Sequence, residues 1–113
     1  MARTKRAPNG SVTLGSGNVY ADLGFRNPDE MLAKAQLVDA IRTIVRKRKL
    51  SQSAAAALVG VAQPKISELL RGNTKGFSCD RLMRMLRLLG QAVRITITPV
   101  KAQRTHGLIQ VAL

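Results

Sequence analysis

The sequence is poor in the residues that build cross-links, metal sites and stacking platforms. It has one cysteine and one histidine, no tryptophan, and aromatic residues make up 3% of it. A single cysteine excludes an intramolecular disulfide, and Cys79 is expected to be a small, buried or half-buried apolar residue. One cysteine and one histidine cannot supply the four ligands of a zinc site within one chain. We therefore expect an aliphatic core and no cofactor.

Acidic residues are also scarce. Six Asp and Glu stand against 19 Lys and Arg, for a formal net charge of +13 at pH 7. Such a chain attracts polyanions, of which nucleic acid comes first and an acidic membrane surface second. No stretch approaches the roughly 18 apolar residues that span a bilayer. The basic segment 1–6 is not followed by the apolar stretch of a secretory signal. We expect a cytoplasmic protein with no membrane partner.

The length of 113 residues suits one domain. Residues 1–27 contain turn-forming pairs and show no helical period, which predicts a flexible basic N-terminal arm. The ordered domain is expected over residues 28–99. Residues 100–113 are expected to form a tail or, from Leu108 onward, a second, weaker strand.

Apolar periodicity and capping residues predict four helices. They are expected over residues 28–49, 52–59 and 63–70, and from Ser78 to Gly90. Ser51 is a suitable N-cap for the second of them, and Gly60 ends it because glycine accepts the left-handed backbone of a tight turn. Pro64 lies in the first turn of the third helix, where no amide donor is needed.

A change of period follows these helices. Val93, Ile95 and Ile97 alternate with polar residues, and this pattern predicts a strand over residues 92–98 that ends before Pro99. Because a lone strand has unpaired backbone groups, we expect Val93, Ile95 and Ile97 to form a homodimer interface across a two-fold axis. An intrachain hairpin with residues 108–111 is the alternative, which would leave dimerisation to helix faces.

Residues 50–72 have the layout of a helix-turn-helix. Ala56 is small where two helices cross closely, and Gly60 makes the turn. Ile66 and Leu69 hold the second helix against the first. The exposed positions of that second helix are then free to read bases in the major groove of duplex DNA.

Five short segments carry a narrower pattern. They are NVYADLG at 18–24, QPKIS at 63–67, LRG at 70–72, FS at 77–78 and the expected strand at 93–98. Residues 50–72 resemble the helix-turn-helix of Cro/repressor-type, XRE-family regulators. Residues 17–99 resemble the small HigA-like antitoxins encoded beside RelE/HigB-type toxins. Three features depart from the general pattern. Leu70 stands where a glutamate is common in Cro/repressor-type regulators, as it does in the antitoxin subgroup, and Ala55 stands where a leucine is common. The chain is also basic where antitoxins often carry acidic segments.

The resemblance implies a mainly α fold, a repressor-like helix-turn-helix bundle with a C-terminal β-strand. It also implies a DNA-binding autorepressor in a toxin–antitoxin operon, and no enzyme. By position, Gln52 would meet a phosphate, and Gln63 and Glu68 would face base edges. The full set of expected DNA contacts is Gln52, Gln63, Pro64, Lys65, Ser67, Glu68, Arg71, Asn73, Thr74 and Lys75.

Two other functions remain open from the residues alone. One is an interaction protein whose main role is to sequester a RelE/HigB-like toxin, with DNA binding secondary. The other is a nonspecific RNA-binding protein, which the scattered aromatic residues argue against because RNA binders usually stack bases on aromatic rings. No phosphate-cradling glycine loop, paired acid–base site or Ser–His–Asp grouping indicates an enzyme.

Overall fold

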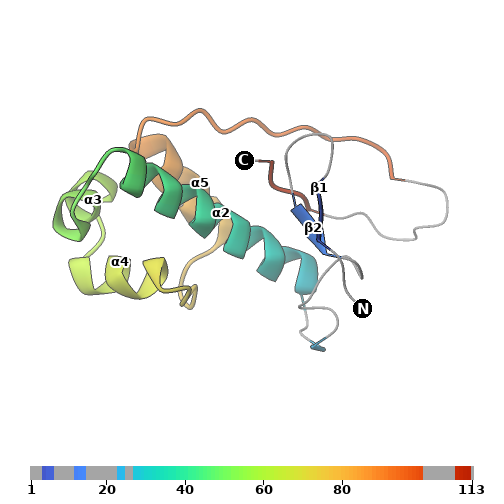
Figure 1. Ribbon diagram of the computed structural model, residues 1–113, viewed down its shortest axis with the longest axis horizontal. Coiled ribbons are helices and arrows are strands. Elements are labelled where there is room, and N and C mark those ends of the chain that lie inside the picture. Colours follow the sequence, from blue (N-terminus) through green and yellow to red (C-terminus); the bar gives the residue numbers. More distant parts are fainter. Residues whose placement is uncertain (1–3, 7–11, 15–22, 25–26, 101–108, 113) are drawn as a thin grey trace. The chain divides into compact units, whose positions relative to one another are not determined.

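The computed structural model describes residues 4–6, 12–14, 23–24, 27–100 and 109–112. The chain divides into two compact units, residues 34–93 on the one hand and residues 1–33 with 94–113 on the other. The helices of the described ranges are α2 (Pro28–Lys47), α3 (Gln52–Val59), α4 (Gln63–Leu70) and α5 (Cys79–Leu88) (Figure 1). None of them combines the length and the apolar content that crossing a membrane requires.

The ends of α2 and α3 follow from local sequence signals. Pro28 opens α2, which has acidic residues in its first turn and basic residues in its last, as the helix dipole favours. Ser51 caps α3, because its side chain accepts a hydrogen bond from the amide of Ala54 at 3.0 Å. Gly60 follows in the left-handed conformation, with φ of 70°. The predicted cap and stop of this helix are therefore confirmed.

The two later helices begin in different ways. Helix α4 follows Ala62, which has no side-chain cap, and Pro64 lies in its first turn. Helix α5 is capped by Ser78, whose hydroxyl accepts from the amide of Arg81 at 3.1 Å. At the start of α4 the amides of Lys65 and Ile66 therefore donate to the backbone carbonyl of Ala62, at 3.0 and 3.1 Å, and not to a capping side chain.

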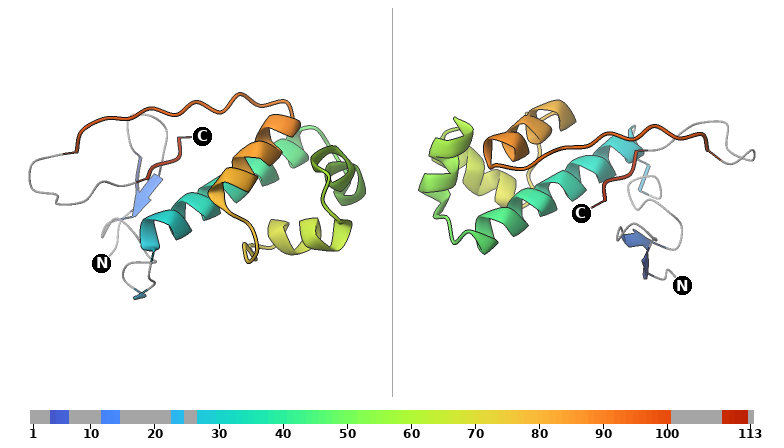
Figure 2. Two further views of the ribbon diagram at one scale, coloured as in Figure 1. Left: turned by 180° about the vertical axis from the view of Figure 1, so that it is seen from behind. Right: turned by 90° about the horizontal axis from the view of Figure 1, so that it is seen from above.

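The core of residues 34–93 is aliphatic, as the composition requires. Its largest fully buried side chains are Leu69, Leu82, Met85, Leu89 and Val38. Helices α3 and α4 pack against each other, and α3 also contacts α5. Helix α5 lies beside α2 in both views of Figure 2. This arrangement leaves one side of α4 facing outward.

The predicted C-terminal β-strand is wrong. Residues 91–100 have no regular secondary structure, and neither do residues 109–112 of the expected second strand. Ile95 and Ile97 are 72% and 92% exposed, so no other segment of the described chain covers these two members of the alternating pattern. A strand depends on a hydrogen-bonding neighbour more than on its own propensity, and residues 91–100 form no strand pairing within the described chain. The dimer interface that rested on this strand loses its support.

A short antiparallel hairpin occurs where the sequence predicted no strand. Strand β1 (Thr4–Arg6) pairs with β2 (Val12–Leu14), with Thr4 opposite Leu14. Each strand has three residues, too few to give a readable alternation. The predicted flexibility of residues 1–27 concerns mostly residues outside the described ranges.

Candidate nucleic-acid interface

Helix α4 has one apolar side and one polar side. Ile66 and Leu69 are buried, at 2% and 0% exposure, and fix the helix to the core. The polar side continues into the loop that follows the helix. We call its exposed residues the recognition surface: Gln63, Pro64, Lys65, Glu68, Arg71, Asn73 and Lys75.

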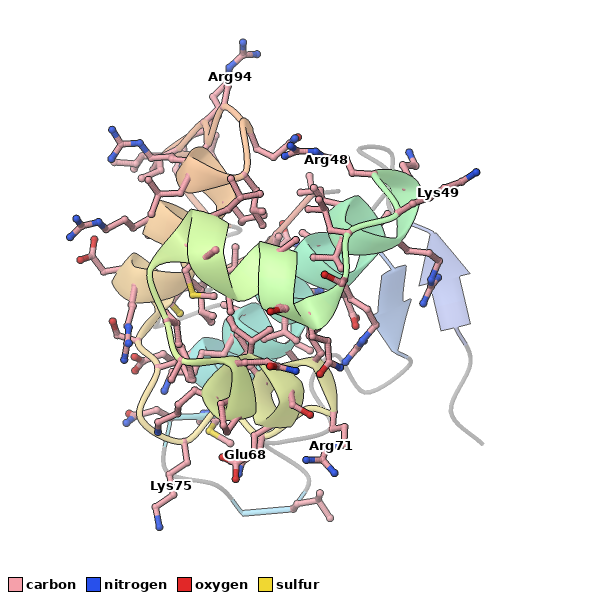
Figure 3. All side chains as sticks on the ribbon, turned by 90° about the vertical axis from the view of Figure 1, so that its left-hand side faces the viewer. Arg48, Lys49, Glu68, Arg71, Lys75 and Arg94 are labelled. Atoms are coloured by element: carbon pink, nitrogen blue, oxygen red, sulfur yellow. The ribbon has the colours of Figure 1, made fainter. Side chains whose placement is uncertain are left out.

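The charged members of this surface project together. Figure 3 shows Glu68, Arg71 and Lys75 pointing outward on the same side of the molecule. Arg48 and Lys49, at the end of α2, lie away from that side in the same view. The basic run that ends α2 is therefore separate from the recognition surface.

The loop after α4 is held by its own hydrogen bonds. The amide of Asn73 donates to the carbonyl of Glu68 at 3.0 Å. The side-chain oxygen of Asn73 accepts from the amide of Lys75 at 3.2 Å. Gly72 makes the reversal possible with φ of 102°, a conformation that side chains with a Cβ rarely adopt. The position of Lys75 after α4 is thus set by the loop backbone together with the Asn73 side chain.

Two cations gather around Phe77, which is 2% exposed. The ammonium of Lys65, from α4, lies 5.7 Å from the ring centroid. The guanidinium of Arg81, from α5, lies 4.6 Å from the same centroid. Arg81 also donates to the carbonyl of Gly76 at 3.2 Å. The attraction of a cation to a ring face limits the freedom of both long side chains and keeps them near Phe77.

The carboxyl end of α4 is bound by a side chain from α2. Arg42 donates to the carbonyl oxygen of Leu70 from Nε at 3.1 Å and from Nη2 at 2.8 Å. The third nitrogen, Nη1, donates to the carboxylate of Asp39 one turn earlier on α2. Arg42 therefore connects α2 to the last residue of α4.

Residues 19–98 match the model of a family described as a helix-turn-helix domain. A solved structure that carries the name of an XRE-family transcriptional regulator is 38% identical to this chain, with a TM-score of 0.68. The similarity covers 74% of this chain and 93% of that one. The chain belongs to the XRE-type helix-turn-helix family. A search of curated proteins gives no match.

Within this XRE-type protein, α3 and α4 are the two helices of the motif, and Gly60 lies in the turn between them. Nine of the ten expected DNA contacts lie on α4 or in the loop after it, two of them, Ser67 and Thr74, half-buried. Gln52 is the exposed first residue of α3. No group of His, Cys, Asp and Glu that could hold a metal ion occurs in the described residues.

Sequence reasoning missed the contacts of three residues of this helix-turn-helix protein, Phe77, Arg81 and Arg42. Phe77 precedes the N-cap of α5, so its spacing of four positions from Arg81 is not a helical pair and does not predict their contact. The bond from Arg42 to Leu70 joins residues 28 apart. No local sequence pattern predicts such a contact, because it depends on how α2 and α4 pack against each other.

Proposed function

We propose that this protein is a transcriptional regulator that binds a specific duplex DNA site through α4. The observation that carries the proposal is the recognition surface itself. It is a polar helix side and a basic loop on a helix-turn-helix whose other side is anchored in the core. The net charge of +13 adds a strong general attraction to DNA. Such a regulator would act in the cytoplasm, beside the chromosome.

In this proposal Gln63 and Glu68 read bases. The amide of a glutamine can bond an adenine at two positions, and a carboxylate accepts from the amino group of cytosine. The Gln63 side chain makes no hydrogen bond within the described residues, so it is available for a base edge. Glu68 is exposed and its side chain is likewise unengaged there.

Lys65, Arg71 and Lys75 would contact phosphates on either side of the groove, and Gln52 would do so from the start of α3. These contacts position the protein without reading sequence. We add Arg81 to these proposed phosphate contacts, because its guanidinium and the ammonium of Lys65 both lie against the ring of Phe77. Of the four remaining residues of the predicted set, Ser67, Asn73 and Thr74 would contribute hydroxyl and amide donors to the same backbone, and Pro64 has no donor to contribute.

The protein is proposed to bind as a homodimer. One motif of this kind reads one half-site, and two half-sites one helical turn apart need two copies. The described residues contain one helix-turn-helix, so the second comes from another copy. A two-to-one stoichiometry of protein to DNA, measured by light scattering of the complex, tests this; a one-to-one complex contradicts it.

The binding test starts from a random duplex library, from which the site is selected with the full chain. Affinity for the selected duplex is then compared with that for a scrambled duplex of equal length at about 150 mM salt, where nonspecific binding is weak. A specific regulator binds the selected duplex at least about a thousandfold more tightly. Equal affinities would refute the proposal.

The finer role proposed is autorepression as the antitoxin of a toxin–antitoxin pair. Its support is the resemblance of residues 17–99 to HigA-like antitoxins. The protein should then bind its own promoter and neutralise the product of a neighbouring small reading frame on co-expression. If that product binds the protein and promoter binding is absent, the toxin-sequestering alternative is the better account.

A further inference from the structure

The last carbonyl of α4 depends on α2 for its hydrogen bonds. The final four carbonyls of a helix have no amide partner within it. At the end of α4, loop amides serve the carbonyls of Ser67, Glu68 and Leu69. In the described residues, the carbonyl of Leu70 accepts only from Arg42, through two nitrogens at 3.1 and 2.8 Å.

The contact also has a favourable charge. The carboxyl end of a helix carries partial negative charge, which a guanidinium offsets. The guanidinium is planar, and its two donors converge on one oxygen, so both the direction and the distance of the helix end are restricted. The ion pair with Asp39 holds the guanidinium in that orientation. Arg42 is itself half-buried rather than free in solvent.

We propose that Arg42 is a positioning residue for DNA recognition, which sets the orientation of α4 in the groove without touching DNA. Ile66 and Leu69 fix the depth of the short helix α4, and Arg42 fixes its carboxyl end. Base contacts depend on this orientation because bidentate bonds to base edges are directional. Phosphate contacts through flexible cationic side chains depend on it much less. The inference rests on the proposed function, since it concerns the same DNA site.

The chain supplies a matched control in Arg48. This residue directly follows the last residue of α2. It donates to the carbonyl of Leu89, which caps the end of α5, at 2.9 Å. Arg42→Met and Arg48→Met each remove one positive charge and one guanidinium contact to a helix end. Methionine keeps a long side chain of good helix propensity. Only Arg42→Met disturbs the recognition helix.

Affinity is measured for the selected duplex and for the scrambled duplex, below the unfolding temperature of every variant and over a range of salt concentrations. Arg42→Met is expected to lower the ratio of the two affinities about tenfold, which equals about 1.4 kcal/mol. Its affinity for the scrambled duplex and the salt slope of that affinity should stay unchanged, because no phosphate contact is lost. Arg48→Met should leave the affinity ratio within about twofold of the unchanged protein.

Two results would overturn the inference. One is an unchanged ratio in Arg42→Met. The other is an equal loss on both duplexes with a salt slope reduced by about one, which would make Arg42 a phosphate contact. If Arg42→Met does not fold, Arg42→Lys keeps the charge and loses the two-nitrogen contact; its ratio should fall about threefold, and an unchanged ratio overturns the inference. If the unchanged protein does not prefer the selected duplex, the proposed function fails instead.

Discussion

Leu69 is the most deeply buried side chain of α4, and its truncation tests how the helix packs against the core. It is 0% exposed, whereas Leu58 of α3 is 42% exposed. Leu69→Ala and Leu58→Ala remove the same atoms from the two helices of one motif. Burial alone therefore separates the two variants.

The expected loss follows from this burial. Truncation of a fully buried leucine removes its transfer free energy and leaves a cavity, for about 3 kcal/mol of unfolding free energy. Leu58→Ala should cost about 1 kcal/mol or less, since much of that side chain already meets water. For a folding unit of this size each kcal/mol lowers Tm by about 4–8 °C. Leu69→Ala should thus lower Tm by roughly 12–24 °C, and Leu58→Ala by about 8 °C at most.

Urea unfolding followed by circular dichroism gives both free energies, and thermal melts give the two Tm shifts. The unfolding slope of each variant should equal that of the unchanged protein, which shows that the same surface is exposed. Equal losses in the two variants, or a loss below about 1 kcal/mol for Leu69→Ala, would show that α4 does not pack through Leu69.

Three further predictions follow from the same contacts: two concern DNA binding and the third concerns the cap of α3. Gln63→Ala should cost about 1–3 kcal/mol of binding free energy on the selected duplex and relax one base preference, whereas Gln52→Ala should weaken binding to all duplexes alike. If both variants lose specific and nonspecific affinity in the same proportion, these roles are wrong. Lys75→Ala should reduce the slope of log affinity against log salt by about one in a titration with labelled DNA; an unchanged slope would remove Lys75 from the phosphate contacts. Ser51→Ala should lower the unfolding free energy by about 1 kcal/mol, because the 3.0 Å hydrogen bond from the amide of Ala54 is lost. The control is Ser53→Ala, at an exposed position inside α3. Equal urea midpoints in the two variants would contradict the capping role of Ser51.

The helices could be predicted because their ends depend on nearby residues. A serine cap, a proline in the first turn and a glycine stop each act within one turn of the chain. These signals predict α3 and α4 over the residues that form them, Gln52–Val59 and Gln63–Leu70. Helix α2 ends at Lys47, two residues before the predicted end, and Lys49 has a left-handed backbone with φ of 54°. Local chemistry was sufficient for the motif and for the position of its recognition surface.

Contacts between distant segments were not predictable in the same way. The alternation of Val93, Ile95 and Ile97 met the requirements of a strand, but a strand also needs a neighbour that the pattern does not specify. The bond from Arg42 to Leu70 joins residues 28 positions apart and depends on the placement of whole helices. The sequence therefore predicted the outward-facing side of α4 and its core anchors Ile66 and Leu69, and missed the bond from Arg42 that holds its carboxyl end.

The two arginines of the α2 region change how the charge of the chain should be counted. Arg42 and Arg48 direct their guanidinium groups at the carbonyls of Leu70 and Leu89, so part of the positive charge neutralises the protein's own helix ends. A salt titration on DNA counts only cations that displace ions from phosphates. The number of ions released on binding should therefore be smaller than the net charge of +13 suggests. Arg42→Lys would preserve the net charge and still weaken the contact with the carbonyl of Leu70. An exchange at this position that conserves charge would therefore still loosen the end of α4.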